Sequence, residues 1–386
     1  MSLVKVKVRG QESVGGRRNI IHNGDFKVAQ RYASKTGVNS NQYVLDRWQI
    51  LNNTCHFTVS QSTDVPAGQG FSNSMKMDVT TQQPSPSAGD YANITQRFEG
   101  KHLQELMKGT SNAKKVTVSF WVKSTLTGTY VLEFDDMDNN RHHPFQYTIS
   151  SANTWEKKII TFNADTTGAI DNDVNGSMRL SWWLGAGTNY TSGTYSASWQ
   201  SRQATDTNRA VGQVLFTGST ANDFYITGVQ MEIGETNTEF ENRPFQQELE
   251  DCMRYFFNAL GDTNGGNYSV FPVNFRNHVS TGNNGHTAFQ VALPTRMRAT
   301  PSLSHNIANS NHVGSGQTAS ATTWNFYHQN QGWSSYAGNG NANTLSRASA
   351  GTAGCQVGTY YFSPASTTAD QIAIGNSLQM FFSAEL

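Results

Sequence analysis

Cysteine, charge and long apolar runs are all scarce in this chain of 386 residues. The three cysteines, Cys55, Cys252 and Cys355, are far apart, and the absence of CxxC or Cys/His clusters argues against a disulfide framework or a zinc site. Buried free thiols are therefore expected. No apolar run approaches the ~20 residues of a membrane helix, and residues 1–10 lack the apolar core of a secretion signal. The sequence predicts a protein made in, and soluble in, a reducing cytosol, without membrane insertion.

Charge of either sign is also limited. Only 15% of the residues are charged, and 28 basic residues balance 28 acidic ones. Because no net field would draw the chain to nucleic acid or to an anionic membrane, neither partner is expected. Walker, GxGxxG, HExxH and nucleophile-elbow motifs are missing as well. We therefore expect no catalytic residues, no cofactor and no metal, and the chain is predicted not to be an enzyme.

Glycine and aromatic residues, in contrast, are plentiful. The chain holds 34 Gly, 21 Phe, 14 Tyr and 8 Trp, with many Thr, Ser and Asn residues between short apolar runs. This composition is typical of all-β proteins, and the length favours two domains. The predicted order is an N-terminal arm (1–18), a jelly-roll β-sandwich (19–241), a short connecting α-helix (242–257) and a C-terminal β domain (258–386).

Alternation of apolar and polar residues marks the strands of the predicted sandwich. The clearest case is VTVSFWVKS, in which Val116, Val118, Phe120 and Val122 share one face. The other strands are expected at 74–80, 91–98, 130–138, 155–162, 178–187 and 222–234. After the helix, strands are expected at 268–275, 287–294, 301–307, 358–364 and 377–386, whereas 324–346 is interpreted as a long aromatic loop.

The predicted helix carries one apolar stripe. Asn242 can cap it, and Pro244 is tolerated in a first turn. Phe245, Leu249, Met253 and Phe256 then recur three and four residues apart, a pattern typical of a buried helix face. This stripe is more apolar than a linker requires, so we expect it to form an oligomer interface.

The N-terminal arm also alternates. Val4, Val6 and Val8 are interleaved with basic residues, and glycines 15 and 16 follow. Period-2 apolar residues need a surface to bury against, which favours an arm that adds a strand to a partner. A flexible basic tail is the alternative.

Two acidic segments and several histidines could bind metals or do chemistry. Asp135, Asp136 and Asp138 precede two asparagines, and Asp165, Asp171 and Asp173 form a second group. Calcium is conceivable, but the spacing of an EF-hand loop is missing, so solvated turns are the favoured interpretation. Histidines such as His142 and His143 show no metal-ligand spacing and are interpreted as exposed loop residues.

Outward-facing aromatic residues are the best candidates for binding. In MRLSWWLGAG, alternation places Trp182 in the core and Trp183 on the opposite face. An exposed flat ring can stack on a sugar, so the predicted glycan-binding residues are Trp183, Tyr190, Trp199, Trp333 and Tyr336. The alternative is that an adjacent loop or another subunit covers Trp183.

Several segments together resemble a known family. They are NIIHNGDFKVAQR (19–31), YVLDRWQI (43–50), VTVSFWVKSTLTGTY (116–130), WWLGAGTNYTSGT (182–194) and, most specifically, the run 208–256. These residues look like tail-fibre and other appendage proteins of bacteriophages. NGDF (23–26) and FYITGVQMEIG (224–234) resemble, more distantly, carbohydrate-binding jelly rolls, whose calcium-holding acidic positions read Thr227 and Gly228 here.

The resemblance implies a bacteriophage virion protein, made in the host cytoplasm and expected to be a homotrimer. Its partners would be other virion proteins of the tail or capsid, and host surface polysaccharide or lipopolysaccharide. The favoured hypothesis is a tail fibre or receptor-binding protein for host attachment. A capsid fibre or decoration protein and a glycan depolymerase with paired carboxylates remain the alternatives.

Overall fold

The computed structural model describes residues 18–258 (side chains of 203 and 205 excepted), 294–299 and 383–386, with the backbones of the strands between 276 and 382. The chain divides into two compact units, residues 1–248 with Leu386, and residues 249–385. The predicted virion-attachment residues Val4, Val6 and Val8 lie outside the described residues. No described helix is long and apolar enough to cross a membrane.

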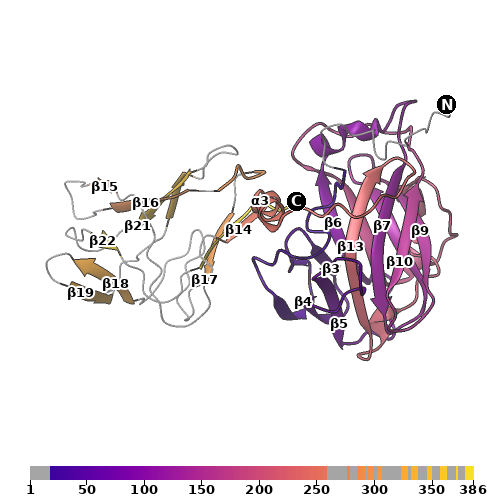
Figure 1. The fold of residues 1–386 in the computed structure, drawn as a ribbon, viewed down its shortest axis with the longest axis horizontal. Helices are drawn as coiled ribbons and strands as arrows, with labels where there is room; N and C mark the ends of the chain where they lie inside the picture. The colour runs from indigo at the N-terminus through magenta and orange to yellow at the C-terminus, as the bar shows by residue number, and fades with distance from the viewer. Residues whose placement is uncertain are drawn as a thin grey trace, which may run out of the picture. The chain divides into compact units, whose positions relative to one another are not determined.

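The first unit is a sandwich of two antiparallel sheets, as predicted (Figure 1). In spatial order, the six-stranded sheet holds β1 (Ser34–Val38), β4 (His56–Ser62), β5 (Ser74–Thr81), β13 (Asp223–Ile233), β7 (Val116–Ser124) and β10 (Glu156–Phe162). The seven-stranded sheet holds β12 (Gln200–Ser201), β9 (Arg141–Ile149), β8 (Gly128–Asp136), β11 (Gly176–Ala186), β6 (Tyr91–Glu99), β3 (Gln49–Asn52) and β2 (Gln42–Tyr43). The described residues thus confirm an all-β fold.

The core lies between the two sheets and follows the predicted alternation. Val118, Phe120 and Val122 of β7 are fully buried there, opposite Leu180 and Trp182 of β11. Aromatic rings fill its centre, because Trp182 contacts Phe120 and Trp48 at centroid distances of 5.6 Å. At the usual 1.5–3 kcal/mol for each large apolar side chain buried, this core is the main source of the sandwich's stability.

Short helices lie in the connections of the sandwich. They are η1 (Gly100–His102), η2 (Gln104–Leu106), α1 (Thr188–Thr191), α2 (Arg202–Thr205), η3 (Asp206–Asn208) and η4 (Phe216–Gly218). The helical turn expected around Leu103 and Leu106 is formed by η1 and η2, and both leucines are buried.

Strand β9 is the clearest element that the sequence did not indicate. Its residues include Pro144, which cannot donate to a sheet ladder and argues against a central strand. In the fold, β12 pairs with β9 only at Arg141 and His142, so the rest of β9, Pro144 included, is an edge. A proline is tolerated at such an edge.

The two ends of the sandwich are tied together. The backbone N–H of Asn19 donates to the Glu241 carboxylate at 2.7 Å, and Arg243 donates to the Asn19 carbonyl at 2.5 Å. The Asn19 side chain also receives the N–H of Met231 and donates to the carbonyl of Val229, both in β13. We call Asn19, Glu241 and Arg243 the end clamp.

The second unit begins within α3 (Phe245–Met253). The helix is shorter than predicted, because Phe256 lies in β14 (Phe256–Asn258) and pairs with Ser383. The first of its three sheets holds β14, β23 (Gln379–Ser383) and β17 (Ser302–Asn306). The second holds β15 (Arg276–His278), β16 (His286–Ala292), β21 (Val357–Phe362) and β20 (Ser346–Ser349). The third holds β19 (Gly332–Ala337), β18 (Thr323–His328) and β22 (Gln371–Ile372), so the expected loop 324–346 contains a hairpin.

Candidate functional site

The outer side of β8 and β11, in the seven-stranded sheet, is covered by the segment 187–215. We call this side the closed face. Glu133, Asp135, Ser181 and Trp183 point outward from β8 and β11, away from the core, yet each is at most 1% exposed. The covering segment hydrogen-bonds to this face, for example from Gln213 to the carbonyl of Trp183 at 2.8 Å.

A buried ion pair joins the closed face to the segment above it. Arg209 donates two hydrogen bonds to Glu133, at 2.6 and 2.9 Å, and Trp183 Nε1 donates to the same carboxylate at 3.1 Å. His142 Nδ1 lies 3.3 Å away. Burial alone would raise the pKa of Glu133, but the Arg209 charge outweighs it and holds the pKa well below its usual range. Glu133 is therefore a structural anion.

A second row of charges lies beside the first. Asp135 accepts a hydrogen bond from Arg179 at 2.6 Å and lies 3.4 Å from Arg202 of α2. The solvated turn expected here is wrong for Asp135 and Asp136, which are both fully buried. The turn forms only at the strand end, where Asp138 accepts the N–H of Asp171. Sequence could not show this, because the cations that pair with these buried carboxylates, Lys108, Arg179 and Arg202, are far from them in the chain.

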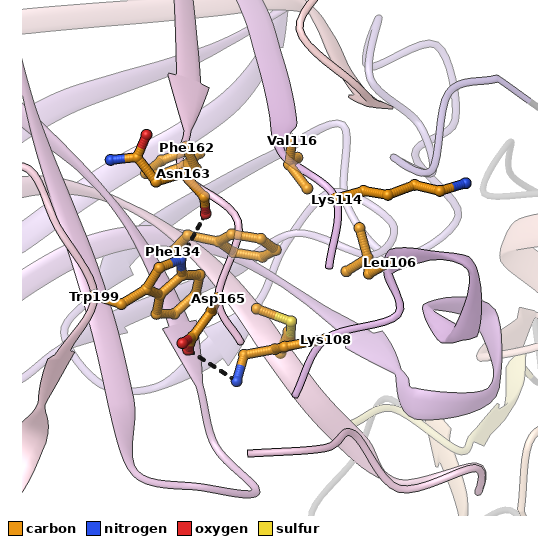
Figure 2. Close-up of a pocket in the computed structure, with 10 residues that line it drawn as sticks. Leu106, Lys108, Lys114, Val116, Phe134, Phe162, Asn163, Asp165 and Trp199 are labelled. Carbon is orange, nitrogen blue, oxygen red and sulfur yellow. Dashed lines mark hydrogen bonds and ion pairs between the residues drawn. The ribbon is translucent and has the colours of Figure 1, made fainter. Parts of the chain in front are cut away.

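A buried lysine lies between the two predicted acidic segments, and Figure 2 shows its ion pair with Asp165. Lys108 Nζ lies 2.5 Å from Asp136 and 3.0 Å from Asp165, and it donates to the carbonyls of Thr167 and Gly168 at 2.7 and 3.0 Å. Burial would raise the pKa of Asp165, but hydrogen bonds from Arg141 and Lys108 lower it. The ammonium thus takes the place that a metal cation would take among these oxygens.

Trp183 cannot stack on a sugar in this structure. It does point away from the main core, as predicted, but only 1% of it is exposed. Arg209 lies 5.2 Å from its ring centroid, and Tyr190 packs on it at 5.2 Å. The alternative, a tryptophan covered by the adjacent loop, is what the structure shows.

The other predicted glycan-binding aromatics also have protein neighbours. Tyr190 is partly exposed but packs edge-on against Tyr91, and Trp199 donates to the carbonyl of Asn163 at 2.7 Å (Figure 2). The cavity beside Trp199 measures about 10 Å³, room for about one water molecule and too little for a sugar. Trp333 and Tyr336 lie in β19, and their side chains are outside the described residues.

The outer side of the six-stranded sheet is accessible, in contrast. Lys76 of β5, Tyr225 of β13, Trp121 and Lys123 of β7, and Trp155, which precedes β10, all point outward and are partly exposed. We call this set the open face. Its strands are in register, because Tyr225 pairs with Lys76 on one side and Lys123 on the other.

The rings of the open face are held in fixed orientations. Trp155 Nε1 donates to Asp64 at 3.0 Å, and its ring meets that of Tyr225 at a centroid distance of 6.2 Å. Lys123 Nζ lies 4.3 Å from the Tyr225 centroid and 5.5 Å from that of Trp155, and it pairs with Asp64. Cation–π contacts and a hydrogen bond thus order these side chains before any ligand binds, which lowers the entropy cost of binding.

The open face was not predicted from the sequence, although the sequence contains a signal for it. The alternation that places Phe120 and Val122 in the core also turns Trp121 and Lys123 outward. The same alternation turns Trp183 outward, but its side of the sheet is covered by the segment 187–215, whose course local sequence does not show.

The four residues of the predicted oligomer interface differ in their exposure to solvent. Phe245 is 54% exposed, Leu249 and Met253 are partly exposed, and Phe256 is buried in β14. The buried residues of α3 are Glu248 and Cys252 instead. The interface and the trimer therefore stay predictions, and Phe245 is the residue of this set most available to a partner. Of the three buried free thiols expected, those at Cys55 and Cys252 are confirmed, and Cys355 lies outside the described residues.

Buried His143 predicts a pH-dependent stability. It packs edge-on against Phe162 and Trp199, and burial lowers its pKa from 6.5 to about 4, so the expectation of an exposed loop histidine is wrong. Since the unfolded chain binds an additional proton between these values, stability falls as pH drops through this window, by up to about 3 kcal/mol. Urea unfolding at pH 7 and pH 4.5 measures the loss. His143→Phe should remove most of this loss of stability. If the stability of that variant falls with pH as steeply as that of the parent, His143 is not its cause.

Comparison with known proteins gives structural similarity alone. No family model matches the chain, and no curated protein matches it by sequence. Among solved structures, the enzymatically active domain of tailspike protein 4 from bacteriophage CBA120 is similar at a TM-score of 0.29 and 15% identity, over 56% of this chain and 21% of that one. A family 4 carbohydrate-binding module is similar at a TM-score of 0.29 and 14% identity, over 55% of this chain and 99% of that one. A family 11 carbohydrate-binding module from Clostridium thermocellum is similar at a TM-score of 0.25 and 12% identity, over 53% of this chain and 96% of that one.

Proposed function

We propose that this chain is a non-enzymatic bacteriophage appendage protein that binds host-surface glycans through the open face. The observation that carries the glycan-binding part is the pair of partly exposed, pre-oriented rings of Trp155 and Tyr225, with the partly exposed Trp121 on the same side of the sheet. Sequence resemblance to tail-fibre proteins supports the virion part. A virion protein that binds host-surface glycans would serve host attachment.

The chemistry of the open face suits a saccharide. Aromatic ring faces carry negative charge density and attract the polarised C–H groups on one side of a sugar ring. Lys76 and Lys123 can donate to sugar hydroxyls, and Asp64 and Asp223 can accept from them. Lys76 pairs with Asp223 at 3.0 Å and Lys123 with Asp64, so the face has nearly balanced charge and is suited to neutral sugars.

Removing one ring tests the proposal. Trp155→Ala should weaken binding to a glycan array of capsular oligosaccharides and lipopolysaccharide O-chains by roughly tenfold, because aromatic contacts at hot spots are typically worth 1 kcal/mol or more. Tyr32→Ala is the matched control. Tyr32 is 44% exposed and has Lys35 4.5 Å from its ring, yet it lies outside the open face. Equal losses in the two variants, or no binding by the parent protein, would refute the open face as the site.

The virion role needs its own experiment. Mass spectrometry of purified particles should detect this chain, and its absence would refute the appendage assignment whatever the glycan result. Particle-bound protein that fails to bind host cells would favour a capsid decoration role. Release of reducing ends from host polysaccharide would instead show a depolymerase.

A further inference from the structure

Lys108 and Asp136 hold an amine and a carboxyl group in direct contact inside the sandwich. Their side chains are 4% and 0% exposed, and Lys108 Nζ lies 2.5 Å from Asp136 Oδ2. Lys108 belongs to the connection between β6 and β7, whereas Asp136 is the last residue of β8. Two groups that the fold keeps together in this way have a very high effective concentration, which favours their condensation over their separate hydration.

The surroundings of the pair are largely apolar. Lys108 Nζ lies 5.3 Å from the centroid of the Trp199 ring (Figure 2). Burial raises the pKa of Asp136 in spite of the nearby ammonium. A proton that passes from Nζ to Oδ2 replaces two buried charges with a neutral amine and a neutral carboxylic acid, which are the forms that react with each other. The apolar side chains that line the adjacent cavity are Leu106, Val116, Phe134, Phe162, Met178 and Trp199.

Asn139 donates to the oxygen that carries negative charge when the carboxyl carbon is attacked. Its backbone N–H and its Nδ2 donate to Asp136 Oδ1 at 3.1 and 3.2 Å. Attack of Nζ on Cγ makes Oδ1 an oxyanion, and fixed donors at such a position stabilise the tetrahedral intermediate. The Asn139 amide is itself held in place, because Nδ2 also donates to the carbonyl of Ala169 at 2.9 Å.

Asp165 is a second acid–base group on the same nitrogen. Its Oδ2 lies 3.0 Å from Lys108 Nζ, and Arg141 orients it by donating to both of its oxygens at 2.7 and 3.0 Å. Asp165 can therefore accept the proton that Nζ loses as the C–N bond forms, and return it to Asp136 Oδ2. The cavity beside Lys108, about 10 Å³, has room for about the one water molecule that is released.

We propose that Lys108 and Asp136 condense to an intramolecular isopeptide bond. The Nζ–Cγ bond forms and the Cγ–Oδ2 bond breaks, so that one ammonium and one carboxylate give one amide and one water molecule, with no change of oxidation state. The ion pair described above is the reactant. The link closes a loop that contains all of β7, so it restricts the unfolded chain and adds to the stabilisation by the ion pair. It does not rest on glycan binding.

Mass spectrometry of the unfolded 386-residue chain tests the bond. We expect an intact mass that is lower than the mass of the sequence by one water molecule. A tryptic digest should contain residues 102–114 joined to residues 124–141, because trypsin does not cleave after a lysine whose side chain is an amide. A chain with the full mass of its sequence, or one that trypsin cleaves completely after Lys108, would overturn the proposal.

Three variants separate this bond from other losses of water. Lys108→Arg keeps the cation but should retain the full mass of its sequence. Lys114→Arg, which alters an exposed lysine beside the same cavity, should lose water as the parent does. Asp165→Asn should form the bond roughly a hundredfold more slowly, measured as the linked fraction at successive times after synthesis. Loss of water in Lys108→Arg would overturn the proposal, and an unchanged rate in Asp165→Asn would refute proton transfer by Asp165.

Discussion

Replacing Lys108 with methionine should lower the free energy of unfolding by about 3–5 kcal/mol, the range found when one partner of a buried ion pair is removed. Its ammonium is 2.5 Å from Asp136 and 3.0 Å from Asp165, and only 4% of the side chain is exposed. Methionine fills the volume but leaves both carboxylates facing each other without a cation. Urea unfolding at pH 7 measures the change.

Two further variants test the cause of that loss. Lys114→Met, an exposed lysine beside the same cavity, should change stability by no more than about 0.5 kcal/mol. Lys108→Ala should lose stability and regain part of it in calcium chloride, because the vacated space is lined by two carboxylates and two carbonyls, the hard oxygen ligands that calcium prefers. A Lys108→Met protein as stable as its parent would show that the two acids are neutralised by protonation or water instead.

Arg209→Met should lower the free energy of unfolding by a similar amount, about 3–5 kcal/mol. Glu133 would remain fully buried, with Trp183 Nε1 and His142 as its nearest polar groups, after losing both guanidinium hydrogen bonds. Because Arg209 belongs to the segment that covers the closed face, the variant should also expose Trp183. Acrylamide quenching of tryptophan fluorescence, with urea unfolding, measures both effects.

The double variant Glu133→Gln/Arg209→Met distinguishes charge from packing. If an uncompensated carboxylate causes the loss, neutralising it should restore a large part of the stability that Arg209→Met alone removes. If the double variant loses as much free energy of unfolding as the two single variants lose together, the guanidinium acts through its contact with the Trp183 ring. In that case the electrostatic explanation fails.

Alternation predicted the core side of the strands well, because one buried face imposes a period of two on any strand. Phe120, Leu180 and Trp182 lie where the pattern placed them. The outer sides could not be predicted equally well. Trp121 and Trp183 occupy equivalent positions in their own strands, and only the course of segment 187–215 makes one accessible and the other buried.

The acidic segments show a second limit of sequence. Asp136 and Asp165 look like loop carboxylates, and their partner Lys108 sits in a connection far from both in the chain. Asp138 and Asp173 have the same local composition and do lie at turns. Pairing across such distances depends on the topology of the sandwich, which local patterns do not encode.

The end clamp has a mechanical consequence. Tension applied to the chain before Asn19 and after Arg243 reaches the hydrogen bonds between these residues and Glu241 first. Force then passes from one end to the other through these bonds and through the bonds of Asn19 to β13, while the other strands lie off this direct path. The sandwich would then lie beside the line of force, so a pull on the chain at its two ends would load these few contacts before it loads the sheets.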